Sequence, residues 1–222
     1  MTTPTVAQDP GELFDIVLAD GTPTGQTKPR AAVHRDGDWH RAIHVWVTGV
    51  DDDGTPFLIV QRRNEHKDTW PGRLDATVGG HYRAGESLTE TLRETEEEIG
   101  ISVTLDELLP VGVRIAVNAR DEQTRDHELQ DVFLLRRDRP LTDYRSNPAE
   151  LSALIQLPIG DLLDMYVGNR ATIEGTNLDA STGEIRTVSL TLDDFIPTVD
   201  RYFYRVAIAA QALLRGDRHI AI

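Results

Sequence analysis

The sequence predicts an α/β protein in which an α/β/α sandwich surrounds a mixed β-sheet. Stretches with the apolar pattern of strands recur along the chain, a capped acidic segment near its middle has helical spacing, and a second helical pattern closes it. At 222 residues the chain can bury one good core. We therefore expect a single domain over residues 1–222.

The N-terminal half is expected to contain a hairpin, a short helix and several strands. The N-terminal extension, residues 1–30, begins with a loose Pro- and Thr-rich terminus, and residues 14–27 have the alternation and turn signal of a small hairpin. Pro29 can open a short helix through residues 31–34. Further strands are expected where apolar residues alternate or run together between turn signals, at residues 40–47, 57–62, 111–117, 127–136 and 150–157.

The remaining segments predict one loop, two helices and an insertion. Residues 118–125 are polar and without periodicity, which indicates a loop. Residues 161–167 have the pattern of a short helix, and residues 170–193 contain two alternating stretches around a turn, as in a hairpin insertion. Apolar residues then recur at three and four, which predicts a C-terminal helix over residues 195–216.

The chemistry of the chain is concentrated between Gly79 and Ile101, where a glycine pair leads into an acidic helix. Ser87 and Glu90 form a capping-box pattern, so the helix should begin after Ser87, and Gly100 should end it. At about 100° per residue, one side of this helix is apolar or β-branched, with Leu88, Leu92, Thr95 and Ile99. The opposite side is acidic, with Glu90, Glu94, Glu97 and Glu98.

The acidic side of this helix indicates a metal site. Like charges three and four residues apart disfavour a helix by a few tenths of a kcal/mol per pair, and a hard cation such as Mg²⁺ relieves that repulsion. The alternative is a solvated acidic face. A cation held by Glu94, Glu97 and Glu98 could neutralise phosphate oxygens and lower the pKa of bound water, and Gly79 and Gly80 have no Cβ to block a ligand. The pattern therefore predicts metal-assisted attack of water on a diphosphate.

Composition excludes several other classes of function. Cysteine is absent, which excludes disulfides, thiolate metal sites and a cysteine nucleophile. The formal charge of −14 argues against binding a nucleic-acid polymer, whose backbone attracts basic residues. No apolar run approaches the eighteen or so residues of a membrane span, and the N-terminus lacks the pattern of a signal peptide. We expect a cytoplasmic protein without a membrane partner.

The acidic stretch resembles the Nudix box of the Nudix hydrolases. That box reads Gly-x5-Glu-x7-Arg-Glu-U-x-Glu-Glu-x-Gly-U, with U apolar, and the chain matches it from Gly80 to Ile101. Two departures are visible, since only six residues separate Glu86 from Arg93, and Thr95 occupies the first U position. The resemblance implies a Nudix-type sandwich, a Mg²⁺ or Mn²⁺ cofactor and a small-molecule diphosphate substrate.

The same resemblance implies roles for individual residues. Glu97 and Glu98 should be metal ligands, Glu94 a ligand or the catalytic base, and Arg93 an organiser that pairs with a carboxylate. The Gly80 carbonyl can also coordinate, and Glu128 occupies a later strand where many Nudix proteins have one more metal-binding or basic carboxylate. The substrate is expected to lie against Gly79, Gly80 and the strand end Arg62-Arg63, although solvated charge is the alternative for these two arginines.

Residues 33–47, 58–72 and 78–81 resemble a subgroup that contains isopentenyl-diphosphate isomerase and its hydrolase relatives. Gly79 occupies the position of the isomerases' catalytic cysteine, which favours hydrolysis over isomerisation. The isomerases also bind a metal through three histidines and two carboxylates, and the matching residues are His34, His40, His81, Asp126 and Glu128. These are suitable ligand types for a second metal site, whereas His44 is interpreted as structural.

We therefore predict a metal-dependent hydrolase that cleaves a diphosphate linkage in a nucleoside-diphosphate-linked or other organic pyrophosphate. Two alternatives remain open. One is a noncatalytic ligand-binding or regulatory module in which the shortened box has lost its geometry, and the other is a prenyl-diphosphate isomerase that uses an acid other than cysteine. The apolar closing helix could serve the core or the interface of a homodimer.

Overall fold

The computed structural model describes residues 9–67, 69–119 and 125–222. Its strands are β1 (Leu13–Val17), β2 (Pro23–Pro29), β3 (Trp39–Val50), β4 (Pro56–Arg63), β5 (Leu74–Asp75), β6 (Val78–His81), β7 (Leu108–Ala119), β8 (Arg125–Arg136), β9 (Leu151–Pro158), β10 (Ile173–Asp179) and β11 (Ile185–Leu190). Its α-helices are α1 (Arg30–Asp36), α2 (Leu88–Thr91), α3 (Arg93–Ile99), α4 (Ile159–Tyr166) and α5 (Tyr202–Arg215). Short 3-10 helices are formed by Leu105–Glu107, Leu141–Asp143 and Leu192–Asp194.

The strands form one mixed sheet with β3 at its centre. The main order is β11-β10-β9-β4-β3-β1-β2, and β8 joins β3 in parallel while β7 pairs antiparallel with β8. Two short strands complete the centre, since β5 pairs with β4 and β6 pairs with β3, both antiparallel. The register of the last pair places His44 opposite Gly79 and Ile43 opposite Gly80. The glycine pair therefore lies in strand β6, hydrogen-bonded to the central strand, and not in a loop.

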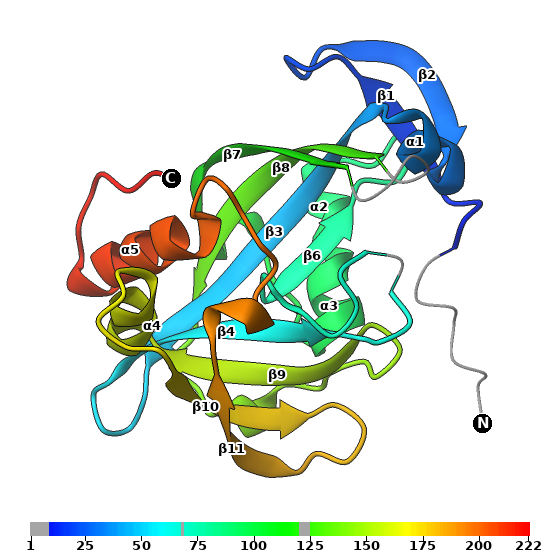
Figure 1. Cartoon of the computed structure of the whole chain (residues 1–222). Helices are drawn as coiled ribbons and strands as arrows, with labels where there is room; N and C mark the ends of the chain where they lie inside the picture. Colours follow the sequence, from blue (N-terminus) through cyan, green and yellow to red (C-terminus); the bar gives the residue numbers. More distant parts are fainter. Residues whose placement is uncertain (1–8, 68, 120–124) are drawn as a thin grey trace.

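Helices cover both faces of this sheet, as the sequence predicted. Alternate residues of β3 point to opposite sides, so Trp46 belongs to one apolar cluster while Val45 and Val47 belong to the other. The cluster around Trp46 includes α4 and α5, and the opposite cluster includes Leu92 and Ile99 from the acidic segment. Figure 1 shows α4 and α5 together on one side, away from α2 and α3. The α/β/α sandwich is confirmed.

The C-terminal helix is shorter than expected. It begins at Tyr202, not at residue 195, because Phe195 forms a bridge to Leu74 and the Ile196 N–H donates to the Leu74 carbonyl at 3.1 Å. Pro197 follows directly, and a residue before proline is disfavoured in the helical region. This extended stretch brings residues 196–203 to the cavity described below.

The polar segment 118–125 is only partly a loop. Asn118 and Ala119 still belong to β7, and Arg125 already belongs to β8, because these residues continue the antiparallel ladder. The rest of the predicted loop, residues 120–124, lies outside the described residues. In the segment 170–193, β10 and β11 form an antiparallel hairpin that extends the sheet beyond β9.

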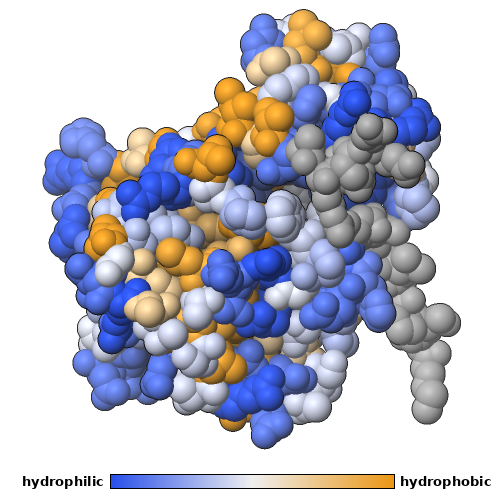
Figure 2. All heavy atoms as spheres, viewed as in Figure 1, coloured by the Kyte–Doolittle hydropathy of each residue, from blue (hydrophilic) through white to orange (hydrophobic). Residues whose placement is uncertain are grey.

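The surface is largely hydrophilic on the face drawn in Figure 2, with hydrophobic side chains in its upper part, where Figure 1 places the β1–β2 hairpin and, below it, β7. Three β-branched residues of β7 are well exposed: Val113, Ile115 and Val117. In the described ranges no helix is both long and apolar enough to cross a membrane.

Candidate active site

The acidic segment forms two short helices where the sequence predicted one. The Ser87–Glu90 capping box is present and starts α2, as predicted. The helix then breaks at Leu92, whose ψ of −12° separates α2 from α3. The buried Thr95 hydroxyl lies 2.8 Å from the carbonyls of both Leu92 and Ile101, so it supplies a donor where the break disturbs the backbone ladder. The box is therefore one residue short between Glu86 and Arg93, which is ahead of the three distal glutamates, Glu94, Glu97 and Glu98.

Arg93 lies among three carboxylates at the start of α3. Its guanidinium donates to Glu86 Oε1 at 2.7 Å, to Glu94 Oε1 at 2.5 Å and to Glu97 Oε2 at 3.0 Å. Glu86 is held further by the Arg83 N–H at 2.9 Å. Arg93 therefore pairs with carboxylates of the box, including Glu86, and its organising role in a metal site stays a prediction.

Glu94 packs directly against Gly80 of β6. A Cβ on Gly80 would lie 2.7 Å from Glu94 Oε1 and closer still to the carbons of that side chain, so only glycine permits this approach. Burial raises the pKa of the Glu94 carboxyl to about 7, against the opposing charge of Arg93. A carboxyl whose pKa lies near neutrality can release its proton when a cation binds, or can accept a proton from water once it is ionised.

Glu98 is the most deeply buried carboxylate of the box, with 3% of its surface exposed. Its Oε2 accepts hydrogen bonds from Gln61 Nε2 at 3.0 Å and from the Gly79 N–H at 3.3 Å. Burial raises the pKa of Glu98 well above its usual range, although Lys67 opposes this. Glu97 differs, because 46% of its side chain is exposed on the outer side of Arg93.

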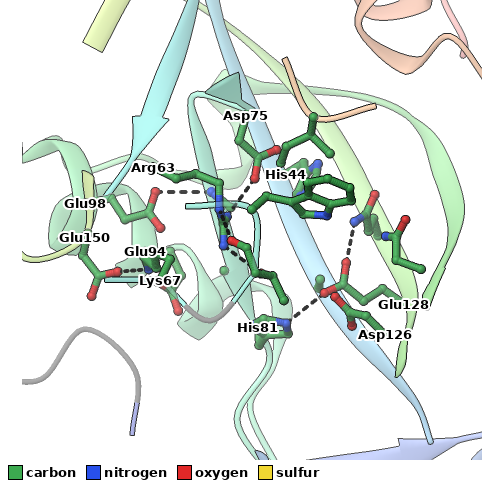
Figure 3. Close-up of a pocket in the computed structure, with 18 of the residues that line it drawn as sticks. His44, Arg63, Lys67, Asp75, His81, Glu94, Glu98, Asp126, Glu128 and Glu150 are labelled. Carbon is green, nitrogen blue, oxygen red and sulfur yellow. Dashed lines mark hydrogen bonds and ion pairs between the residues drawn. The ribbon is translucent and has the colours of Figure 1, made fainter. Parts of the chain in front are cut away.

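A cavity of about 650 Å³ unites these groups with the later strands. Figure 3 shows Glu94, Glu98, Lys67 and Glu150 on one side of it, and His81, Asp126 and Glu128 on the other. Both predicted glycines, Gly79 and Gly80, line it.

Arg63, from the predicted strand end, and Lys67, which no sequence pattern indicated, also line this cavity. Arg63 pairs with Asp75 at 2.8 Å, and Lys67 pairs with Glu150. Arg62, the predicted substrate contact, instead donates to the Gly72 carbonyl at 2.9 Å and is not among the described lining residues. Neighbours in a strand point to opposite faces, so the pattern of β4 could have selected Arg63 over Arg62 only if the orientation of β4 were known.

The five residues matched to the isomerase metal site lie together at the far side of the cavity. His81 Nε2 is 2.9 Å from Glu128 Oε1, and Asp126 Oδ1 is 3.6 Å from His40 Nε2 and 3.8 Å from His34 Nε2. Three of these atoms are buried and without a hydrogen-bond partner: His34 Nε2, His40 Nε2 and Asp126 Oδ1. Such orphaned ligand atoms converge as they would around a cation.

The electrostatics of this cluster favour neutral imidazoles. Burial lowers the pKa of His34 to about 3, with a further contribution from the Arg30 charge, and burial also lowers the pKa of His40 and His81. Burial raises the pKa of Asp126, and neighbouring Glu128 adds to this effect. Arg30 lies 3.1 Å from His81 Nδ1. Neutral imidazole is the form that binds metals.

The two clusters differ in how closely their ligand atoms approach. Among the described residues, sets with ligand atoms within 4.8 Å of one another are His34, His40 and His81, and His40, Asp126 and Glu128. Within the described ranges, no such set is formed by Glu94, Glu97 and Glu98. The Arg93 guanidinium pairs with both Glu94 and Glu97 and so lies between them. Holding one cation with all three glutamates would require their side chains to turn.

An α/β sandwich in which a glycine-containing strand pairs with the central strand, beside a glutamate-rich helix and over one cavity, defines a hydrolase of the Nudix type. A family model described as the NUDIX domain matches residues 38–175. The chain belongs to the Nudix family.

Sequence similarity to two Nudix hydrolases agrees with this assignment. Nudix hydrolase 3 of Arabidopsis thaliana is 37% identical over 151 residues, which cover 66% of this chain and 19% of that protein. A Nudix hydrolase of Clostridium acetobutylicum is 30% identical over 206 residues, covering 90% of this chain and 96% of that protein. A solved structure from Deinococcus radiodurans has a TM-score of 0.49 and 24% identity, and the similarity covers 72% of this chain and 91% of that one.

The raised pKa of Glu94 leads to a prediction about stability and pH. A carboxyl whose pKa rises from 4.5 in the unfolded chain to about 7 in the fold keeps a proton on folding, so its contribution to stability falls as the pH rises from 4.5 through 7. In EDTA, we expect wild type to lose about 2–3 kcal/mol of unfolding free energy relative to Glu94→Gln when the pH rises from 5 to 8. Urea denaturation at both pH values measures this. If the unfolding free energies of wild type and Glu94→Gln changed in parallel with pH, the raised pKa of Glu94 would be refuted.

Proposed function

We propose that the protein is a divalent-metal-dependent hydrolase that cleaves the diphosphate linkage of a nucleoside-diphosphate-linked or other organic pyrophosphate. The observation that carries the proposal is the position of Glu98, a buried carboxylate of the box that faces the cavity beside the Gly79 N–H. A buried carboxylate is unfavourable unless a proton or a cation compensates it. Membership in the Nudix family supports the same reaction class.

The donor set of the cavity suits a hard cation. Carboxylate and carbonyl oxygens are the ligands that Mg²⁺ and Mn²⁺ prefer, and Glu94, Glu97, Glu98 and the Gly80 carbonyl would supply them. Such a cation, when bound, neutralises phosphate oxygens and lowers the pKa of bound water. Arg93 orients Glu94 and Glu97, and the raised pKa of Glu94 suits it to accept a proton near neutral pH.

Basic groups in the cavity would hold the diphosphate itself. Arg63, Lys67 and Arg114 all line the cavity within an acidic chain of net charge −14. Lys67 is paired with Glu150, and Arg63 with Asp75, so each would reach a phosphate as part of a charged network. These residues can position an anionic substrate, which also needs the metal to offset the glutamates.

Product analysis on a panel of diphosphate compounds, with Mg²⁺ and with Mn²⁺, tests the proposed function. We expect metal-dependent release of phosphate-containing products from at least one nucleoside-diphosphate-linked or prenyl compound. Binding of such compounds without turnover would instead favour a noncatalytic module. Isomerised product without phosphate release would indicate the isomerase reaction, and the subgroup resemblance stays a prediction, because the relatives described above are named only as Nudix hydrolases.

We further propose that His34, His40, His81, Asp126 and Glu128 hold a second metal ion. The three orphaned buried atoms support this proposal, since a cation would give each of them a partner. Imidazole with carboxylate suits Mn²⁺, Zn²⁺ or Fe²⁺. The preference for Mg²⁺ or Mn²⁺ at the glutamates, a cytoplasmic location and assembly as a homodimer also remain predictions.

Metal titration of a histidine variant tests the second site. We expect His34→Gln to weaken Zn²⁺ binding by about 10- to 100-fold in calorimetry, because one of the buried ligands is removed. His66→Gln is the control, since His66 is exposed on a loop outside the cavity lining. Equal Zn²⁺ affinity for wild type and His34→Gln would exclude this site.

A further inference from the structure

His44 faces the cavity from β3, between the glutamates and the histidine cluster. Its backbone pairs with Gly79 of β6, and its side chain lines the cavity, where Figure 3 shows it beside Asp75. It belongs to neither proposed set of metal ligands. The sequence alone favours a structural role for His44, because the strand pattern shows no partner for it.

The partner of His44 comes from the C-terminal helix. Tyr202, the first residue of α5, places its hydroxyl 3.0 Å from His44 Nδ1 and 2.9 Å from Trp46 Nε1. All three side chains are buried, with 7% of His44, 1% of Tyr202 and 0% of Trp46 exposed. Tyr202 lies beyond the segment that matches the family model.

These contacts determine which nitrogen of His44 carries the proton. The indole of Trp46 only donates, so the Tyr202 oxygen must accept that hydrogen bond. If Nδ1 also donated to this oxygen, the Tyr202 proton would be left without an acceptor in a buried position, since the structure gives the hydroxyl no third partner among the described residues. Tyr202 therefore donates to His44 Nδ1, and the proton of the neutral ring is on Nε2.

The charge states of both groups agree with this tautomer. Burial lowers the pKa of His44, so the ring carries one proton at neutral pH, although the charge of Asp75 opposes the shift. Burial also raises the pKa of Tyr202, which keeps the hydroxyl protonated. The Arg114 guanidinium lies 4.1 Å from the centre of the Tyr202 ring and pairs with Asp200 at 2.8 Å. Tyr202 is thus held on its other side as well.

The Nε2 edge of His44 lies beside Gly79. A Cβ at Gly79 would be 3.6 Å from Nε2, an ordinary contact distance, so this edge faces the glycine pair of β6. Within the described ranges Nε2 forms no hydrogen bond, and both His44 and Gly79 line the cavity. A donor beside the glycines expected to contact substrate is suited to an anionic oxygen.

We infer that His44 is a substrate-binding residue that donates its Nε2–H to a non-bridging oxygen of the diphosphate, with Tyr202 and Trp46 as positioning residues that fix its tautomer. This inference rests on the proposed function. It assigns the C-terminal helix to the site, because α5 supplies the hydroxyl that orients the donor.

Two amide variants at position 44 separate the roles of the two ring nitrogens. The amide of His44→Gln can reach the position of Nε2, whereas the amide of His44→Asn can reach only that of Nδ1 and keeps a partner for Tyr202. Calorimetry with Mg²⁺ and methylenediphosphonate, a diphosphate analogue whose P–C–P linkage is not hydrolysed, measures the difference. We expect His44→Asn to weaken binding by about 10- to 100-fold, and His44→Gln by less than about 5-fold. Equal losses in two folded variants, checked by near-UV circular dichroism, would overturn the inference.

The tautomer is observable without turnover. Nitrogen NMR of the metal-free protein should show His44 protonated at Nε2, and Tyr202→Phe should convert this signal to a mixture of tautomers. Added Mg²⁺ and methylenediphosphonate should shift the Nε2 resonance in wild type. A ring protonated at Nδ1, or an Nε2 resonance that does not respond, would overturn the assignment.

Failure of the inference and failure of the proposed function give different results. If no diphosphate is hydrolysed but methylenediphosphonate binds with the expected difference between the two amide variants, the hydrolase proposal fails and the role of His44 stands. If hydrolysis is observed and His44→Asn keeps the wild-type KM and kcat, the role of His44 fails alone. A purely structural role for His44 would lower the stability of both amide variants and leave their KM unchanged.

Discussion

Glu98→Gln is expected to reduce kcat by about 100- to 1,000-fold, with little loss of stability. The glutamine is nearly isosteric, but it lacks the charge that would balance a cation in the buried site, and removing one such electrostatic group typically has an effect of this size. Because burial raises the pKa of Glu98, the neutral amide should be tolerated and the metal-free protein should become as stable as wild type or more so. Steady-state kinetics with saturating Mg²⁺ and thermal unfolding in EDTA measure the two effects.

The control for this variant is Glu96→Gln on the same helix. Glu96 is exposed and absent from the cavity lining, so its charge should have no effect on kcat beyond about 2-fold at ordinary ionic strength. A matched loss in both variants would show that the net charge of the helix matters and not the position of Glu98. Full activity of Glu98→Gln would remove the basis for the proposed metal site at the box.

The two ends of the helical acidic segment were predicted correctly from local sequence patterns. The Ser87–Glu90 capping box and the stop at Gly100 depend on contacts a few residues apart, and both are present in the structure. The break at Leu92 was missed, because six residues between Glu86 and Arg93 fit a continuous helix as well as two short ones.

The parts of the site that depend on distant contacts could not be predicted. Arg63, Lys67 and Glu150 meet in the cavity because β4 pairs with β9, and no short-range pattern specifies that pairing. The contact between His44 and Tyr202 joins residues separated by 158 positions. The histidine cluster was identified only through the family resemblance, since the spacing of His34, His40 and His81 has no helical or strand period.

Arg93→Met is expected to lower the unfolding free energy of the metal-free protein by about 3 kcal/mol. Three carboxylates, from Glu86, Glu94 and Glu97, lose their shared cation, and removing one partner of a buried ion pair typically has this effect. Most of the loss should come from Glu86 and Glu94, because Glu97 is 46% exposed and its pair is screened by water. Urea denaturation in EDTA measures the change.

Arg93→Lys provides the matched control for charge. A lysine keeps the positive charge but not the planar group that reaches all three carboxylates, so its stability should fall between those of wild type and Arg93→Met. Mg²⁺ should then stabilise Arg93→Met more than wild type, because the released carboxylates are free to bind the cation and binding to the folded state adds stability. If Arg93→Met were as stable as wild type in EDTA, or gained no more from Mg²⁺, Arg93 would not be the group that organises these glutamates.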